Sequence, residues 1–212
     1  IRSELLARRT EESWGAITLG SITHPDWRQF QGQPLPAVAE ALHQEPVDAI
    51  LTLLDRDELR TSAFFHGMSE DNLRTILAEP YVMIGTDASI RAPDGPLSHD
   101  YPHPRAYGSF SRFLRMVLDG LPIALPEAIH KITALPAAHF GLSDRGRLAP
   151  GLAADIVLFD PATLRDGATF AAPHTLSEGI LTVIVNGVIT WQDRRPTGPR
   201  AGRFLHPAFP PI

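Results

Sequence analysis

A short apolar run at residues 81–84, with the sequence YVMI, constrains the fold of this chain more than any other segment. Pro80 precedes the run and Gly85 ends it, so it is too short for a helix and predicts a buried parallel strand. Asp87 follows just past the carboxyl end of that strand. In barrels of alternating strands and helices, this end of the strands carries the active site. An aspartate after a strand is also a common turn or helix-capping residue, so its position alone leaves both roles open.

The segment after Asp87 predicts a long and stiff loop over residues 90–108. Several prolines lie in it, and each fixes its own backbone φ angle. Loops longer than about 12–15 residues in a compact domain are usually functional or disordered. The loop also contains polar side chains that suit catalysis or binding, namely His99, His103, Arg105 and Tyr107. Together with Asp87, these residues form the best candidate site in the sequence.

The first 140 residues alternate helical and strand patterns. Strands are expected over residues 14–22, 63–66 and 81–84, and helices over residues 34–54 with a break at Pro46, 70–77, 109–118 and 126–140 with a break at Pro136. This order is typical of the α/β class, in which helices cross over between parallel strands.

Residues 142–212 differ in class from what precedes them. Strands are expected over residues 154–160, 181–186 and 188–191, and Asn186-Gly187 is a signal for a two-residue hairpin between the last two. Asp155 and Asp160 flank the first of these strands and are expected to cap turns. An antiparallel sheet of three or four strands is thin for an independent domain, so we expect other strands to complete it.

The parallel strands are too few for a closed barrel. An eight-stranded α/β barrel takes about 250 residues, and this chain has 212 residues and only two or three such strands. Residues 1–141 therefore read as the last strands and helices of a barrel. We expect the missing portion to lie in another chain or in a segment outside this sequence.

Composition excludes several classes of protein. A net charge of −5 and the absence of a basic patch give no reason to expect nucleic acid as a partner. The chain has no cysteine, so it contains neither a disulfide nor a thiolate metal site. No apolar run approaches the roughly 20 residues of a membrane span, and no signal peptide is visible. These features favour the cytoplasm, although the chain begins with Ile1 and not Met.

Several motifs together resemble a known family. They are the GTD segment at 85–87, HPRAYGSF at 103–110, KITALPA at 131–137, DRGRLAPGLAADIVLFD at 144–160 and VNGV at 185–188. This combination is similar to the C-terminal part of the amidohydrolase superfamily and, within it, to the N-acyl-D-amino-acid deacylases, or D-aminoacylases. The HPR-x-YG loop is the motif that points most specifically to the deacylases.

The resemblance implies an α/β fold made of a (β/α)8 metal-dependent hydrolase barrel beside a small β-sandwich. Residues 1–141 would belong to the barrel and residues 142–212 to the C-terminal strands of the sandwich. The family binds zinc at the barrel rim, mostly through ligands that lie N-terminal to this chain, including a His-x-His pair. None of the nine histidines here has that spacing. The implied partner is therefore the N-terminal portion of the same enzyme.

The resemblance also implies roles for the candidate residues. Zinc lowers the pKa of its bound water to about 7, and a neighbouring aspartate can take and return a proton. Asp87 matches the family's general acid/base, and a contact of Asp87 with the metal is left open. Arg105 matches the arginine that binds the substrate carboxylate, a task that suits the planar guanidinium. His103 and Tyr107 are expected to assist substrate binding in the same loop.

Two alternatives stay open beside the hydrolysis of N-acyl-D-amino acids. The chain could belong to a cyclic amidase of the same superfamily, of the dihydroorotase or hydantoinase type, because dihydroorotate also carries a carboxylate. It could also be a non-catalytic scaffold subunit that kept the fold without the metal. Retention of Asp87 argues against the scaffold.

Overall fold

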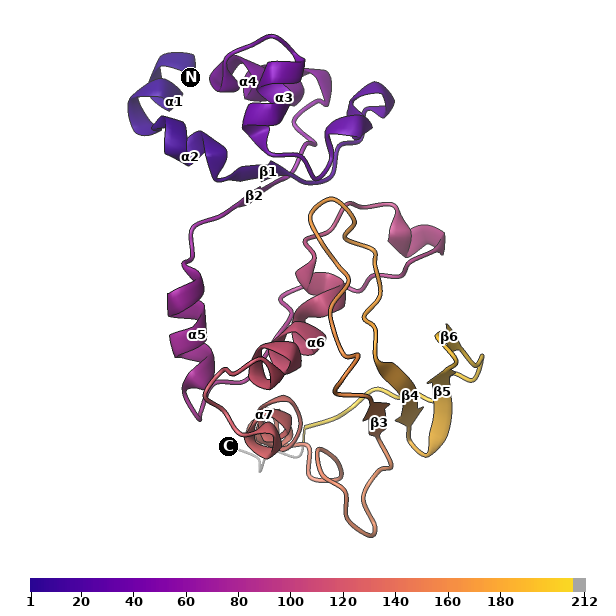
Figure 1. Cartoon of the computed structure of the whole chain (residues 1–212). Helices are drawn as coiled ribbons and strands as arrows, with labels where there is room; N and C mark the ends of the chain where they lie inside the picture. The colour runs from indigo at the N-terminus through magenta and orange to yellow at the C-terminus, as the bar shows by residue number, and fades with distance from the viewer. Residues whose placement is uncertain (208–212) are drawn as a thin grey trace. The chain divides into compact units, whose positions relative to one another are not determined.

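The computed structural model describes residues 1–207, and these form two compact units with separate hydrophobic cores (Figure 1). Unit 1 combines three segments, Ile1–Ser69, Asp87–Tyr107 and Ala168–Thr175. Unit 2 takes the rest of the described chain, which is Glu70–Thr86, Gly108–Gly167 and the part from Leu176 onward. The predicted boundary at residue 142 concerns the barrel and the sandwich of a whole enzyme, and it stays a prediction.

Unit 1 is mostly helical. Its elements in chain order are α1 (Arg2–Arg8), α2 (Glu11–Gly15), β1 (Ile17–Leu19), the 3-10 helix η1 (Pro25–Phe30), α3 (Leu35–Ala41), α4 (Pro46–Arg56), β2 (Ala63–Phe65) and the 3-10 helix η2 (Gly95–Ser98). The strands β1 and β2 pair antiparallel, with Ile17 opposite Phe65. The core brings together apolar side chains from β1 and from one face each of α3 and α4, among them Ile17, Leu19, Leu35, Val38, Val47 and Leu53.

Local sequence explains where these helices begin. The expected break at Pro46 is confirmed, because Pro46 opens α4 at a position where a missing N–H costs nothing. The expected strand over residues 14–22 is shorter than predicted, since α2 takes its first part. The Thr10 hydroxyl accepts the N–H of Ser13 at 3.3 Å, so a helix starts there and carries the buried Trp14.

Unit 2 combines helices with one antiparallel sheet (Figure 1). Its elements are α5 (Glu70–Ala78), α6 (Arg105–Leu118, which begins in unit 1), α7 (Leu125–Ile132), α8 (Ala134–His139), β3 (Ile156–Phe159), β4 (Ile180–Val185), β5 (Val188–Gln192) and β6 (Arg195–Pro196). The sheet order is β3-β4-β5-β6. The predicted hairpin is confirmed: Asn186 and Gly187 have φ angles of 49° and 80°, as the tight turn between β4 and β5 requires.

The core of unit 2 lies between its helices and the start of the sheet. Phe113, Leu114 and Val117 of α6 pack with Ala128 of α7. The predicted division of residues 126–140 into two helices is also confirmed. The break falls at Thr133, however, and Pro136 sits inside the first turn of α8, where a proline is tolerated.

The predicted strand at residues 81–84 is wrong for this structure. The segment is coil, and its nearest backbone bond is a turn from the Val82 N–H to the carbonyl of Glu79. A parallel strand exists only through hydrogen bonds to neighbouring strands. Among the described residues every strand pairing is antiparallel, and none lies beside this segment.

A buried lysine anchors the chain just before that segment. Lys131 of α7 is fully buried, and its Nζ donates a hydrogen bond to the backbone carbonyl of Glu79. Burial lowers the pKa of Lys131, and the negative charges of Glu127 and Glu79 partly oppose this effect. The bond fixes the point at which the chain leaves α5 and turns towards residues 81–87.

Candidate active site

Most of the predicted site residues lie around one hollow in unit 1. The hollow has a volume of about 220 Å³, and its lining includes Asp87, Arg91, Tyr101, His103 and Arg105 together with residues from the two edges of the β1–β2 region. We call it the site hollow. Three of the five candidate residues, Asp87, His103 and Arg105, therefore line one cavity, whereas His99 and Tyr107 do not.

Asp87 and Arg105 form an ion pair across this hollow. The Nη2 atom of Arg105 lies 2.8 Å from Oδ2 of Asp87. The Asp87 side chain is 89% exposed, and the Arg105 side chain is 45% exposed. Asp87 has a φ of 45°, a left-handed conformation that aspartate tolerates better than most residues. An exposed pair of this kind contributes only about 0–1 kcal/mol, so a ligand can replace either partner at small cost.

Arg105 is held by the start of a helix and not by a loop. The predicted loop over residues 90–108 ends at Pro104, and α6 begins at Arg105. Proline suits this place because its fixed φ angle is that of a first helical turn. A side chain on a helix is held more precisely than one on a loop, so the direction of Arg105 is restricted.

His103 supports Arg105 through its ring. The backbone N–H of Arg105 donates to Nδ1 of His103 at 3.0 Å, which makes Nδ1 an acceptor and leaves the proton of the neutral ring on Nε2. The ring packs edge to face against Phe64 and Phe170, with centroid separations of 5.2 and 5.0 Å. Such contacts are favourable aromatic geometry and fix the plane of the imidazole.

Tyr107 is placed differently from Asp87, His103 and Arg105. It is absent from the residues that line the site hollow, and its ring packs against His174 at 5.7 Å. Burial raises the pKa of Tyr107, and the nearby positive charge of Arg91 partly opposes this rise. Tyr107 therefore does not line the site hollow, and its predicted contact with substrate stays a prediction.

Sequence reasoning missed several residues that build the hollow. The Tyr101 hydroxyl donates to the carbonyl of Phe170 at 2.7 Å, and this links segments 69 residues apart. Gly32 sits against both groups, and a Cβ at this position would collide with the Tyr101 hydroxyl and the Phe170 carbonyl. No local signal marks Phe170. Arg91, by contrast, lies in the predicted loop and could have been found as its second arginine.

The described residues do not by themselves form a metal site. Residues 1–207 contain no group of three or more His, Asp or Glu side chains placed to hold a metal ion. Asp87 is the carboxylate that reaches the site hollow, and one carboxylate cannot complete the four-ligand coordination of zinc. Ligands from the N-terminal portion of the enzyme stay a prediction of the sequence.

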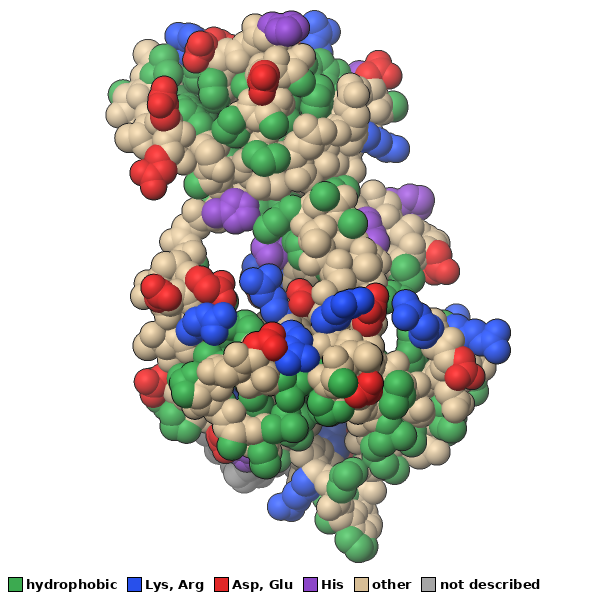
Figure 2. Space-filling model, in the orientation of Figure 1, with side chains coloured by type: hydrophobic (Ala, Val, Ile, Leu, Met, Phe, Trp, Pro, Cys, Tyr) green, Lys and Arg blue, Asp and Glu red, His purple; other side chains and the backbone are tan. Residues whose placement is uncertain are grey.

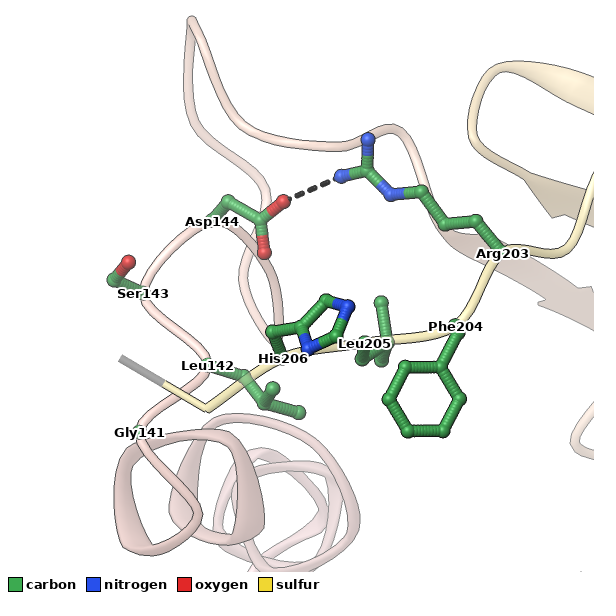
Figure 3. A pocket seen from close by; sticks show the side chains of 8 residues that line it. All are labelled: Gly141, Leu142, Ser143, Asp144, Arg203, Phe204, Leu205 and His206. Carbon is green, nitrogen blue, oxygen red and sulfur yellow. Dashed lines mark hydrogen bonds and ion pairs between the residues drawn. The ribbon is translucent and has the colours of Figure 1, made fainter. Parts of the chain in front are cut away.

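A second hollow lies in unit 2 beside the end of the described chain (Figure 3). It has a volume of about 430 Å³ and is lined by residues 141–144 and 203–206. We call it the tail hollow. Asp144 accepts from Nη2 of Arg203 at 2.7 Å and from Nε of Arg145 at 3.0 Å, so two guanidiniums hold one carboxylate. The hydrogen bond from Arg145, aided by the charges of both arginines, lowers the pKa of Asp144.

In the view of Figure 2, basic and acidic side chains are interspersed and no single-sign patch forms. Asp155 and Asp160 act as predicted in turns: Asp155 accepts the Asn186 N–H at 2.7 Å, and Asp160 accepts from the Ala162 N–H and the Thr163 hydroxyl. Among the described residues, no helix is both long enough and apolar enough to cross a membrane.

Comparison with known proteins identifies the relatives of this chain. An N-acyl-D-aspartate deacylase from Alcaligenes xylosoxydans xylosoxydans is 41% identical over 68% of this chain and 28% of its own length. A D-aminoacylase from the same organism is 38% identical over 84% of this chain and 34% of its own length. The solved structure of an N-acyl-D-glutamate deacylase from Bordetella bronchiseptica, in complex with zinc and a phosphonate inhibitor, superposes with a TM-score of 0.73 at 34% identity. That match covers 91% of this chain and 37% of the relative.

The resemblance inferred from the motifs is thereby confirmed. These relatives share an α/β metal-dependent hydrolase fold, and this chain spans 28% to 37% of their lengths. The model of the amidohydrolase family matches residues 10–191, which is most of the sequence. The chain therefore belongs to the amidohydrolase family.

Proposed function

We propose that this chain is the C-terminal part of a zinc-dependent N-acyl-D-amino-acid deacylase, which hydrolyses the acyl amide and releases a carboxylate and a D-amino acid. The observation that carries the proposal is the pair of Asp87 and Arg105 in one hollow. The Asp87 carboxylate can be displaced from its partner at small cost, and the Arg105 guanidinium is suited to bind a substrate carboxylate. The similarity to three deacylases supports the same reaction.

Arg105 binds the α-carboxylate of the substrate. Its planar guanidinium can form two parallel hydrogen bonds to a carboxylate, and its place at the first position of α6 restricts its direction. Asp87 forms an ion pair with this guanidinium. The substrate carboxylate would take that place and release Asp87 towards the scissile amide.

Asp87 carries the proton of the hydrolysis. As the O–C bond forms between a water oxygen and the acyl carbon, the Asp87 carboxylate takes one proton from that water. When the C–N bond then breaks, the protonated Asp87 returns the proton to the leaving nitrogen, which departs as the amine of the D-amino acid. The aspartate ends in its starting state. Both steps use a side chain that is exposed and held by one arginine.

The active unit in this proposal includes more than this chain. The missing zinc ligands would come from the barrel strands that precede it, and residues 1–141 and 142–212 would complete the (β/α)8 barrel and the β-sandwich. Apolar side chains on the sheet are exposed: Val157, Leu158 and Leu181 are 51% to 54% accessible to water. This exposure supports the proposal that another part of the enzyme covers the sheet. A cytoplasmic location belongs to the same proposal.

An assay on the complete enzyme, meaning this chain with the rest of its barrel, tests the proposal. We expect turnover of N-acetyl-D-amino acids, loss of that turnover after dialysis against a chelator, and recovery on adding zinc. Turnover of the L enantiomers alone would overturn the stereochemical claim. Turnover of dihydroorotate or a hydantoin in place of open-chain amides would favour the cyclic amidase. A folded, zinc-loaded protein with no turnover of any of these would favour the scaffold.

A further inference from the structure

The site hollow contains a second arginine for which the proposed reaction has no role. Arg91 lines it together with Arg105. We propose that Arg91 binds a second carboxylate of the substrate, so that the enzyme is selective for N-acyl derivatives of D-aspartate or D-glutamate. This inference rests on the proposed function, because Arg105 is taken to bind the α-carboxylate.

The two arginines are held in the same manner. Arg105 pairs with Asp87, and Arg91 donates through Nη1 to Oδ2 of Asp100. The aspartates are exposed, with 89% of the Asp87 side chain and 55% of the Asp100 side chain accessible to water. Exposed ion pairs contribute about 0–1 kcal/mol, so two substrate carboxylates could replace or join both aspartates at little cost. A substrate with a single carboxylate would use only one of these guanidiniums.

The guanidinium of Arg91 is well suited to receive an anion. Its side chain is 23% exposed, half the exposure of the Arg105 side chain at 45%, so water screens its charge less. Asp100 engages Nη1, and within residues 1–207 the structure shows no hydrogen bond from Nε or Nη2.

A hydroxyl in the same hollow can complete the subsite. Ser62 lines the hollow, and its Oγ accepts the backbone N–H of Ser21 at 2.7 Å. No acceptor for the Ser62 hydroxyl proton is found in the part of the chain that the structure describes, so this proton can be donated to a carboxylate. Phe64, also in the lining, offers an apolar wall for the methylene groups of an aspartate or glutamate side chain.

The test compares acidic and uncharged substrates on the zinc-loaded complete enzyme. With wild-type protein, N-acetyl-D-glutamate or N-acetyl-D-aspartate should be turned over with a higher kcat/KM than N-acetyl-D-leucine. Arg91→Met should lower kcat/KM for the acidic substrates at least about tenfold, because a hydrogen bond to a charged group is lost, and should change it less than about twofold for N-acetyl-D-leucine. Arg8→Gln, which removes an exposed positive charge from α1, is the matched control and should change neither.

A merely structural role of Arg91 predicts a different pattern. If Arg91 only fixed its loop through Asp100, then Arg91→Met would lower kcat/KM for both substrate types equally. That result, or a wild-type preference for N-acetyl-D-leucine, would overturn the inference. Asp100→Asn adds a second readout: removal of the competing carboxylate should lower KM for the acidic substrates and leave KM for N-acetyl-D-leucine unchanged.

Binding of glutarate and butyrate separates failure of the subsite from failure of the deacylase proposal. By calorimetric titration, glutarate should bind at least about tenfold more tightly than butyrate, and Arg91→Met should remove this difference. If no N-acyl-D-amino acid is turned over but glutarate binds in this manner, the proposed function fails and the subsite stands. If glutarate binds no better than butyrate, the subsite is overturned whatever the assay shows.

Discussion

The site hollow and the tail hollow each contain an aspartate that faces an arginine, but the two carboxylates are held differently. Asp87 has Arg105 as its single ion-pair partner among the described residues, and its side chain is 89% exposed. Asp144 is held by Arg145 and Arg203 together, and the Arg145 side chain is only 9% exposed. The carboxylate with one exchangeable partner suits catalysis, whereas the one between two guanidiniums suits stability. The number of partners and their burial separate the two roles better than the residue types do.

The largest expected effect is a loss of kcat when the carboxylate of Asp87, but not that of Asp144, is replaced by an amide. Asp87→Asn should lower kcat for an N-acetyl-D-amino acid by about 10²–10⁴-fold, because asparagine cannot carry the proton. Asp144→Asn is the matched substitution in the tail hollow and should change kcat less than about twofold. Steady-state kinetics on the complete enzyme measures both. A comparable loss of kcat in the two variants would remove the distinction between the hollows.

Removal of the arginines should sharpen the same contrast. Arg105→Gln should raise KM by about 10–100-fold, because the substrate loses a charge-assisted contact. Arg203→Gln removes the exposed partner of Asp144 and should leave KM within about twofold of the wild-type value. If Arg105→Gln left KM unchanged, the assignment of the substrate carboxylate to Arg105 would be wrong.

Substitutions in the tail hollow should lower the free energy of unfolding. Arg145 donates to Asp144 and also to Asp155, so Arg145→Met removes one of the two guanidiniums that hold Asp144 and the ion-pair partner of Asp155. We expect a loss of about 1–3 kcal/mol in the free energy of unfolding, measured by urea denaturation. Arg105→Gln should change this free energy by less than about 0.5 kcal/mol, since its ion pair is exposed. Equal destabilisation by both variants would contradict the assignment of the stabilising role to the tail hollow.

The smallest expected effect is a change with pH in the stability that Asp144 contributes. The pKa of Asp144 is lowered in the folded state, mainly by the hydrogen bond from Arg145. A lowered folded pKa contributes stability that is fully present above the unfolded pKa and is lost as pH falls through the folded value. The difference in urea midpoint between wild type and Asp144→Asn should therefore be present at pH 7 and shrink below about pH 4. A difference that grows as the pH falls would have the wrong sign.

Local chemistry explains which features could be predicted from the sequence. The Asn186-Gly187 turn and the start of α4 at Pro46 depend on nearby residues, and both were predicted. The predicted strand at residues 81–84 is absent from the structure. A strand depends on hydrogen-bonded partner strands, which a local pattern does not specify.

In the candidate site, too, some residues could be predicted from the sequence and others could not. Asp87, His103 and Arg105 follow one another within a short stretch, and the family motifs led to all three. The contribution of Phe170 could not be predicted, since it reaches His103 and Tyr101 only through tertiary packing. The start of α6 at Arg105 was missed because the prolines before it favour a loop, although Pro104 also suits the residue that precedes a helix.

Binding of substrate to Asp87→Asn tests the central claim most directly. If Asp87 both carries the proton and competes for Arg105, then an unprocessed N-acetyl-D-amino acid should bind this variant with a Kd equal to or lower than the wild-type KM. The loss of activity would then lie entirely in kcat. Calorimetric titration of the zinc-loaded complete enzyme gives this Kd. A Kd raised tenfold or more would show that Asp87 holds the substrate or the shape of the hollow, and would contradict its assignment as the exchangeable acid/base.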